Sequence, residues 1–293
     1  MLFYKPSLSS RLFDIFNYIF LFLLALLMLY PFFYIAMLSI TAPEVPLTKG
    51  YVIPPVATLR NYKQVLSNHY IQYGFTNTIQ RTLVGTVLSV IAMVMCAYAL
   101  SKPYFPNRRM WTAFVVFTMF FSGGMIPSYL VNRQLGLMNS FWVLILPGLI
   151  QTYNMLIARN FFMSLPEELH ESGRIDGASD LLILVRIILP VSMPIVATLC
   201  LWQAVSHWNA WFDSMLYFTD PKKQVLQLVL RRIVLEGSND LMDISGLGDE
   251  NVTSNPETIK AATTMVATIP IIIVYPFLQK YFVKGMMVGS LKG

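Results

Sequence analysis

Six stretches of this sequence contain no ionised side chain over a length that could cross a lipid bilayer. The hydrocarbon core of a bilayer is about 30 Å thick, and a helix of roughly 20 apolar residues spans it. Backbone polar groups find no water there, so a spanning segment satisfies them best as a helix. The sequence therefore predicts an all-α integral membrane protein with six transmembrane helices. The stretches are Ile15–Thr41, Thr82–Ser101, Met110–Asn132, Gln134–Ala158, Ile187–Phe212 and Ala261–Gln279.

The composition indicates that lipid, rather than water, surrounds these stretches. Hydrophobic residues make up 56% of the 293 residues, and charged residues only 12%, against about 25% in an average soluble domain. The alternative is a set of buried helices in a soluble protein, which would require six such runs in one small chain. The net charge of +6 comes from basic residues scattered along the chain, which argues against nucleic-acid binding.

Cysteine and histidine usage favours neither a disulfide framework nor a metal centre. Cys96 and Cys200 both lie inside apolar stretches, where inert packing is the usual role of a cysteine. His69, His170 and His207 are far apart in the sequence and lack metal-ligand spacing. Because no catalytic constellation is apparent, we expect a protein that is not an enzyme.

Positive charges beside short loops predict the orientation of the chain, since such loops stay on the cytoplasmic side. The loop between the second and third stretches carries Lys102, Arg108 and Arg109, whereas the next loop carries only Arg133. Six spans with both termini in the cytoplasm fit this pattern.

The first stretch and the long loops complete the predicted organisation. The run Ile15–Ile40 is too long for the core of a signal peptide and has no small-residue cleavage site, so we expect a retained helix. Two long loops, about residues 42–75 and 213–258, would lie outside. We divide the one membrane domain into an N-terminal span with the first outside loop, 1–75, and a core, 76–293.

The energy source is predicted to lie on another subunit. No aspartate or glutamate lies well inside a predicted span, and no interrupted helix is evident, which argues against an ion-coupled carrier. The chain also has no G-x-x-x-x-G-K-[ST] loop to hold nucleotide phosphates. If ATP drives this protein, we expect ATP and Mg to be bound by a partner, and no cofactor to be bound by this chain.

The loop between the fourth and fifth stretches reads SLPEELHESGRIDGASDLLILVRIILP. Ser164 and Glu167 have the spacing of a capping box, Pro166 would fall in the first helical turn, and Gly177 is suited to end the helix. The sequence predicts a short polar helix, a sharp turn and a span containing Pro190. The plainest interpretation is an ordinary capped loop helix.

The spacing in this loop resembles the E-A-A-x(3)-G-x(9)-I-x-L-P signature of ABC-importer permeases. Glu171-Ser172-Gly173 stands at E-A-A, followed by Gly177, Ile187, Leu189 and Pro190 at every expected spacing. Ser172 and Gly173 replace two alanines but are also small. In that family the loop forms a cytoplasmic coupling helix that docks on the ATPase subunit. The resemblance assigns this role to Glu168, Glu171, Ser172, Gly173, Asp176, Gly177 and Ala178.

Further segments resemble the carbohydrate branch of that family, related to the six-span maltose permease subunit. FSGGMIPSYL, LGLMNSFWVLILPG, HWNAWFDSMLYF and QLVLRRIV are similar to the subgroup that carries complex oligosaccharides. The resemblance implies a second, different permease subunit, two cytoplasmic ATPase subunits and an extracytoplasmic solute-binding protein. The outside loop, about residues 213–258, resembles the place where the family contacts its binding protein.

Amide and aromatic side chains in two spans mark a candidate substrate path, because sugars bind aromatic faces with hydrogen-bonding groups beside them. The alternative is that these groups bond neighbouring helices or form an interfacial aromatic belt. In the maltose branch the partner permease makes most sugar contacts. The candidates are Gln151, Tyr153, Asn154, Trp202, Gln203, His207, Trp208 and Asn209.

Two questions about the cargo stay open at the level of sequence. The rival to a saccharide is an amino acid, a peptide or another solute carried by a permease of the same family. Four basic residues in the second long loop could favour an acidic oligosaccharide such as a uronate, or could equally meet an acidic patch of the binding protein. These are Lys222, Lys223, Arg231 and Arg232.

Overall fold

The computed structural model describes residues 8–47, 51–236 and 255–290. Regular structure in these ranges is helical, apart from one isolated β-bridge between Thr41 and Ala57. The longer helices are α1 (Leu8–Ser39), α3 (His69–Ser101), α4 (Arg108–Phe120), α5 (Met125–Gln134), α6 (Thr152–Met163), α10 (Met193–Asn209) and α14 (Pro256–Ser290). The shorter ones are α2 (Arg60–Ser67), η2 (Phe141–Leu144), η3 (Leu146–Gly148), α7 (Glu168–Ile175), α8 (Asp180–Ile183), η4 (Leu184–Ile188), α9 (Leu189–Val191), α11 (Phe212–Tyr217), η5 (Pro221–Lys223), α12 (Leu226–Arg231) and η6 (Arg232–Glu236).

The chain forms two compact units, and unit 1 comprises residues 1–68 and 233–268. Its polar centre is Asn61, whose buried side-chain amide donates to the carbonyls of Ser39 at 2.9 Å and Thr41 at 2.8 Å. The Thr258 hydroxyl donates to Asn61 Oδ1 at 3.4 Å. One amide thus joins the end of α1, the helix α2 and the start of α14.

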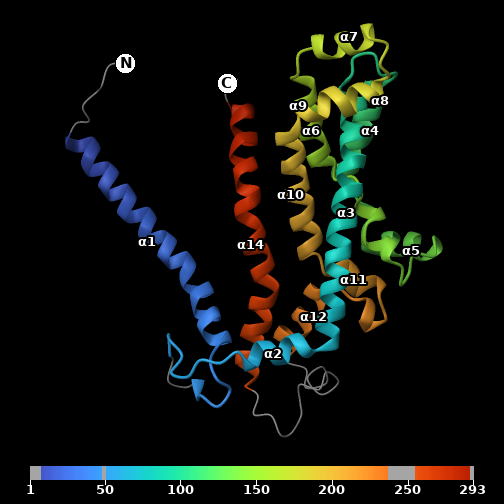
Figure 1. Ribbon diagram of the computed structural model, residues 1–293. Helices are drawn as coiled ribbons and strands as arrows, with labels where there is room; N and C mark the ends of the chain where they lie inside the picture. Colours follow the sequence, from blue (N-terminus) through green and yellow to red (C-terminus); the bar gives the residue numbers. More distant parts are fainter. Residues whose placement is uncertain (1–7, 48–50, 237–254, 291–293) are drawn as a thin grey trace. The chain divides into compact units, whose positions relative to one another are not determined.

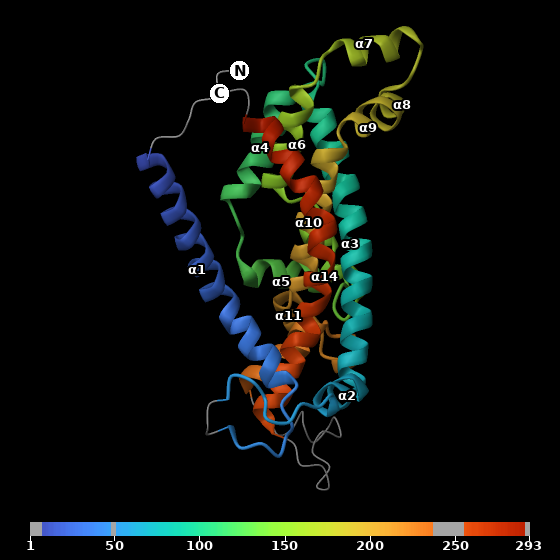
Figure 2. The ribbon, with the colours of Figure 1, turned by 60° about the vertical axis from the view of Figure 1, so that its left-hand side comes forward.

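Unit 2 comprises residues 69–232 and 269–293 and is built around α3. Figures 1 and 2 both show α10 and α6 running beside α3, and buried side chains of the three helices form one core. Met93, Met155 and Leu199 are completely buried there. The helices α7 and α8 lie at one end of this unit, and α11 and α12 lie at the other (Figure 1).

The apolar stretches of the sequence form helices in this fold, but several of them are broken by bends instead of forming one straight helix each. α1 and α3 are each long and apolar enough to cross a membrane. Three further pairs reach that length and apolarity only when joined across sharp bends: 114° between α4 and α5, 51° between η2–η3 and α6, and 87° between α8–α9 and α10. The expectation that no helix is interrupted is therefore wrong.

Glycine and proline account for these bends. Gly124 has φ +90° between α4 and α5, a backbone conformation that glycine adopts without steric cost, and Figure 2 shows α5 turned across the direction of α3. Pro147 and Gly148 precede the second bend. Pro190 and Pro194 flank the third, and the π-helix η4 precedes it in the same chain segment; proline and π-turns are recognised causes of helix kinks.

Candidate functional site

A pocket lined by both polar and apolar side chains lies in unit 2, where α3, α5, η2–η3 and α10–α11 meet. Its volume is about 390 Å³, near the lower end of the range of about 300–1,000 Å³ for small-molecule pockets. We call it the Arg81 pocket. It is lined by Arg81, Ser122, Gly124, Met125, Ser128, Val143, Leu144, Pro147, Gly148, Gln151, Gln203, Ser206, His207, Ala210, Phe212, Asp213, Leu216 and Tyr217.

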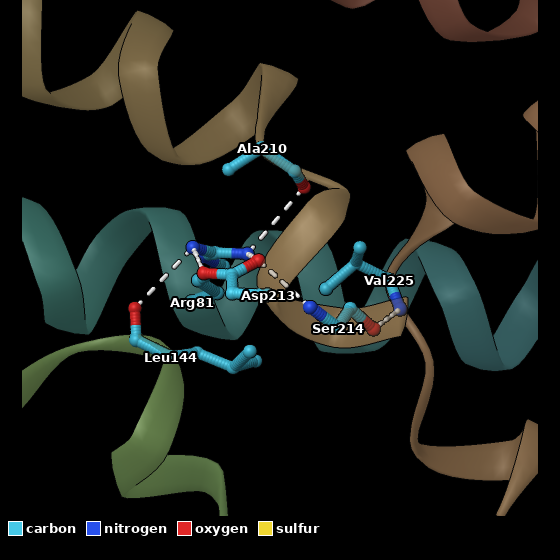
Figure 3. Close-up of polar contacts among 6 residues, drawn as sticks. All are labelled: Arg81, Leu144, Ala210, Asp213, Ser214 and Val225. Atoms are coloured by element: carbon cyan, nitrogen blue, oxygen red, sulfur yellow. Dashed lines mark hydrogen bonds and ion pairs between the residues drawn. The ribbon is translucent and has the colours of Figure 1, made fainter. Parts of the chain in front are cut away.

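A buried ion pair forms one wall of this pocket. Figure 3 shows Arg81 of α3 facing Asp213 of α11, with Nη1 donating to Asp213 Oδ1 at 2.9 Å and Nη2 donating to Oδ2. The same two nitrogens also donate to the carbonyls of Ala210 at 3.4 Å and Leu144 at 3.3 Å. The Arg81 side chain is only 4% exposed, so this pair joins three chain segments in a largely water-free place.

Further side-chain contacts hold residues 222–226 of the same chain against α3. Thr78 Oγ1 accepts from the backbone N–H of Leu226 at 2.9 Å. Asn77 donates to the carbonyls of Lys222 and Gln224, both at 2.9 Å. Asn77 and Thr78, together with Arg81 one turn further along α3, thus position η5, α12 and α11.

Of the eight predicted path residues, three line the Arg81 pocket: Gln151, Gln203 and His207. Asn154 supports one of them, since its amide donates to Gln151 Oε1 at 2.8 Å. The other four lie elsewhere: Tyr153 is exposed, Trp202 packs on the core, Trp208 meets Phe75 edge to face at 6.4 Å, and Asn209 donates to the carbonyl of Val205.

Arg81 and Asp213 were not among the predicted site residues, although the sequence held a signal for them. Arg81 directly precedes one charge-free stretch and Asp213 directly follows another. With alternating span directions, the start of the second span and the end of the fifth lie on the same side of the membrane. A charge at the end of a span is costly without a partner of opposite charge. This argument would have predicted that Arg81 and Asp213 form a pair.

Gly85 gives α10 room to approach α3 beside the pocket. A Cβ atom at this position would lie 2.6 Å from His207 Nε2, closer than non-bonded atoms approach one another. We expect Gly85→Ala to displace the His207 ring and to destabilise the folded protein by about 1–3 kcal/mol, as overpacking does. The thermal unfolding midpoint of the purified protein measures this loss.

The matched control for that prediction is Gly148→Ala, because a Cβ there would meet nothing within 4 Å. We expect Gly148→Ala to leave the midpoint near that of the wild type. Equal midpoints for the two variants would contradict the tight contact at Gly85.

The α7 segment, residues 164–190, is the second candidate site. The helix begins at Glu168 with Glu167 as N-cap and no side-chain capping bond, so the predicted capping box is wrong. The Ser164 hydroxyl instead donates to the carbonyl of Phe161 at the end of α6, and Pro166 precedes the helix. Glu168 and Glu171 do lie in the first turn, where the helix dipole favours negative charge.

Aromatic and charged contacts hold α7 against the end of α3 and the segment that follows it. The His170 ring stacks on Tyr98 with centroids 5.7 Å apart, and its Nε2 shares a hydrogen bond with the Tyr98 hydroxyl. Arg174 lies 4.0 Å above the ring of Tyr104. Burial lowers the pKa of His170, and the charge of Lys102 lowers it further. A neutral His170 therefore accompanies this packing at pH 7.

The remaining predicted coupling residues divide between a buried side and an exposed side. Gly173 is buried, and a Cβ there would lie 2.8 Å from Ile183, so its small size serves packing within this chain. Ala178 packs on the core. Gly177 has φ +73° and ends the helix as predicted. Exposed are Glu168, Glu171, Ser172, Asp176 and Gly177, together with Ile175, which is 85% exposed and was not predicted.

The predicted contact with a binding protein falls partly outside the described residues. Residues 237–254 of the loop 213–258 are not described. Of the four basic residues, Lys223 Nζ donates to the carbonyl of Asn139 at 3.2 Å, and Arg231 lies 3.9 Å above the ring of Trp211. Neither these two nor Lys222 or Arg232 line the Arg81 pocket.

Comparison with known proteins gives matches over nearly the whole chain. The polygalacturonan/rhamnogalacturonan transport system permease protein YtcP of Bacillus subtilis is 40% identical over 98% of this chain and 100% of its own length. Protein LplC of the same organism is 41% identical over 97% of this chain and 96% of its own.

A solved structure agrees with these matches. It is a bacterial ABC transporter involved in the import of the acidic polysaccharide alginate, and one of its chains superposes with a TM-score of 0.87 at 34% identity, covering 95% of this chain and 99% of that one. The model of the family described as binding-protein-dependent transport system inner membrane component matches residues 7–288. The chain belongs to this family of inner-membrane transport components.

Proposed function

We propose that this chain is a transmembrane permease subunit of an ATP-driven importer and forms half of the path for an oligosaccharide delivered by a solute-binding protein. The full-length similarity to YtcP, a polygalacturonan/rhamnogalacturonan permease, carries the proposal. A galactooligosaccharide permease, GanQ of Bacillus subtilis, also matches, at 29% identity over 95% of this chain and 95% of its own length. These relatives favour a saccharide, with an acidic one included, over a peptide or amino acid.

The α7 segment is the proposed coupling helix, between the fourth and fifth of six spans. Its exposed side presents the carboxylates of Glu171 and Asp176 on either side of the apolar Ile175. A partner surface with a small apolar hollow and basic side chains beside it would bury Ile175 and pair both charges. The cytoplasmic ATPase subunits are the proposed partners, and they bind ATP and Mg.

The membrane arrangement follows from the same proposal. The chain would lie in the bacterial cytoplasmic membrane with both termini in the cytoplasm, beside a second, different permease subunit. The exposed apolar side chains along α1, such as Phe13, Phe16 and Leu27, would then face lipid or that partner. The Arg81 pocket would lie in the half of the path farther from the ATPase, because it is at the end of unit 2 away from α7.

The test of this function is uptake into vesicles. Reconstitute the chain with its permease partner, the ATPase and the loaded binding protein, and measure accumulation of a galacturonate oligosaccharide inside the vesicles. We expect accumulation that requires ATP and stops when the ATPase subunit is left out, because the sequence holds no phosphate-binding loop. Accumulation without the ATPase, or none with the complete assembly, would refute the proposal.

A further inference from the structure

The polar groups of the Arg81 pocket differ in how much hydrogen-bonding capacity they have left. Gln203 is 1% exposed and donates to Met93 Sδ at 3.6 Å, and a thioether is a weak acceptor. Buried amides normally find stronger partners. Ser128, Gln151 and Ser206 line the same pocket and are exposed. Neutral donors and acceptors are therefore present for a ligand that carries hydroxyl groups.

The charged groups of the pocket, by contrast, are engaged mainly with each other, although Arg81 Nε, which is buried, has no hydrogen-bond partner. Arg81 and Asp213 are the only arginine, lysine, aspartate or glutamate side chains among its lining residues. Both terminal nitrogens of Arg81 donate to Asp213, and each also donates to a backbone carbonyl. Asp213 Oδ1 accepts a further bond from the backbone N–H of Ser214 at 2.8 Å. The two terminal nitrogens of Arg81 are therefore not available to donate two parallel hydrogen bonds to a ligand carboxylate.

A carboxylate that entered this pocket would lose water without gaining a counter-ion. Burying an unpaired charge costs far more than burying a hydroxyl that finds a hydrogen bond. The start of α6 adds the partial positive charge of a helix N-terminus next to Gln151, which is less than one full charge. Together, these effects favour binding of the uncharged, hydroxyl-bearing part of a sugar over binding of its carboxylate.

We propose that the Arg81 pocket is a saccharide subsite that recognises the hydroxyl groups of one sugar unit and not its carboxylate. The proposal rests on the proposed transport function and adds which part of the substrate this chain reads. Preference for an acidic saccharide would then come from other parts of the assembly. Gln203 and Gln151 are the residues that determine recognition here, and the Arg81–Asp213 pair positions the wall around them.

The experiment compares two probes with one carbon skeleton, a galacturonate trisaccharide and its methyl ester, which lacks the charge. The readout is the number of sugars transported per ATP hydrolysed by the reconstituted complete transporter. This ratio separates the permease step from delivery by the binding protein. We expect the wild type to give ratios for acid and ester that agree within about twofold, which corresponds to roughly 0.4 kcal/mol.

Two substitutions and a control test the named residues. Gln203→Met keeps the shape of the side chain and removes its amide, and we expect the ratio to fall about 2- to 10-fold equally for both probes, the value of one hydrogen bond. Gln151→Arg supplies the missing free cation and should make the ratio for the acid exceed that for the ester. Asn209→Leu removes an amide of the same helix that does not line the pocket and should change neither ratio.

The outcomes separate this proposal from the transport function. A wild-type ratio at least about fivefold higher for the acid than for the ester would overturn it and assign carboxylate recognition to this pocket or its α6 terminus, since that difference exceeds what a neutral site gives. Equal ratios for Gln203→Met and Asn209→Leu would also overturn it, by placing the pocket off the path. In both cases the wild type still accumulates sugar, whereas failure of the transport function abolishes accumulation altogether.

Discussion

Asp213→Ala is expected to destabilise the folded protein by about 3–5 kcal/mol, because it leaves a buried guanidinium without its counter-ion. The Arg81 side chain is only 4% exposed, whereas that of Asp213 is 29% exposed, so it is the guanidinium that stays shielded from water when the carboxylate is removed. The two remaining carbonyl partners, of Leu144 and Ala210, do not neutralise the charge. The thermal unfolding midpoint of the purified protein should fall well below that of the wild type.

A second ion pair of the same chain provides the control. Arg60 and Glu44 lie 2.7 Å apart, but their side chains are 56% and 51% exposed. Exposed pairs contribute about 0–1 kcal/mol, so Glu44→Ala should shift the midpoint only slightly. The double substitution Arg81→Met with Asp213→Leu should recover much of the loss, since replacing both members of a buried pair by apolar groups is often neutral. A midpoint for Asp213→Ala no lower than that for Glu44→Ala would contradict the buried pair.

The apolar patterning of the sequence predicted where helices form better than how they are divided. The stretches Ile15–Thr41 and Thr82–Ser101 lie almost wholly within α1 and α3. The third, Met110–Asn132, contains the 114° bend between α4 and α5. Counting apolar residues cannot reveal such a bend, because it depends on the φ of Gly124. The paired glycines of FSGGMIP were the available signal.

The two candidate sites differ in how far local sequence determines them. Gly177 ends α7 with a positive φ, as its place after a short polar helix predicts, because that conformation is a local property of glycine. The N-cap of α7 was predicted three residues too early, at Ser164 instead of Glu167, since Ser164 bonds back to α6 instead of capping forward. The Arg81–Asp213 pair joins residues 132 positions apart, so no local motif indicates it, and the available signal is the place of each charge at the end of a charge-free stretch.

The resemblance assigned Gly173 to the coupling contact, but the structure gives this residue a packing role within the chain. Gly173 is small because Ile183 and Ile187 of the same chain fill the space beside it. The exposed face instead carries Ile175, whose side chain is 85% exposed. Single exposed apolar side chains are common on protein surfaces, so Ile175 alone does not mark a docking site. The exposed carboxylate of Glu171 and the conformation of Gly177 are therefore the features to test.

Gly177→Val is expected to weaken association with the ATPase by about 5- to 30-fold, since a left-handed conformation costs a side chain roughly 1–2 kcal/mol. A Cβ at Gly177 would meet nothing within 4 Å, so the loss comes from the φ of +73° and not from a clash. Gly177→Asn is the matched control, because asparagine tolerates this conformation, and it should stay near the wild type. The valine variant tilts or unwinds the end of α7.

Glu171→Lys is expected to have the larger effect on the same contact, because like charges at a desolvated interface cost several kcal/mol. Glu171 is exposed in the first turn of α7, so the variant folds while it also loses the favourable dipole interaction. The measurement is a pull-down of the ATPase with each variant, paired with ATP hydrolysis stimulated by the loaded binding protein in proteoliposomes. Wild-type assembly and stimulation with both Glu171→Lys and Gly177→Val would mean that α7 is an ordinary loop helix, because a docking surface could not absorb a reversed charge and a strained terminus together.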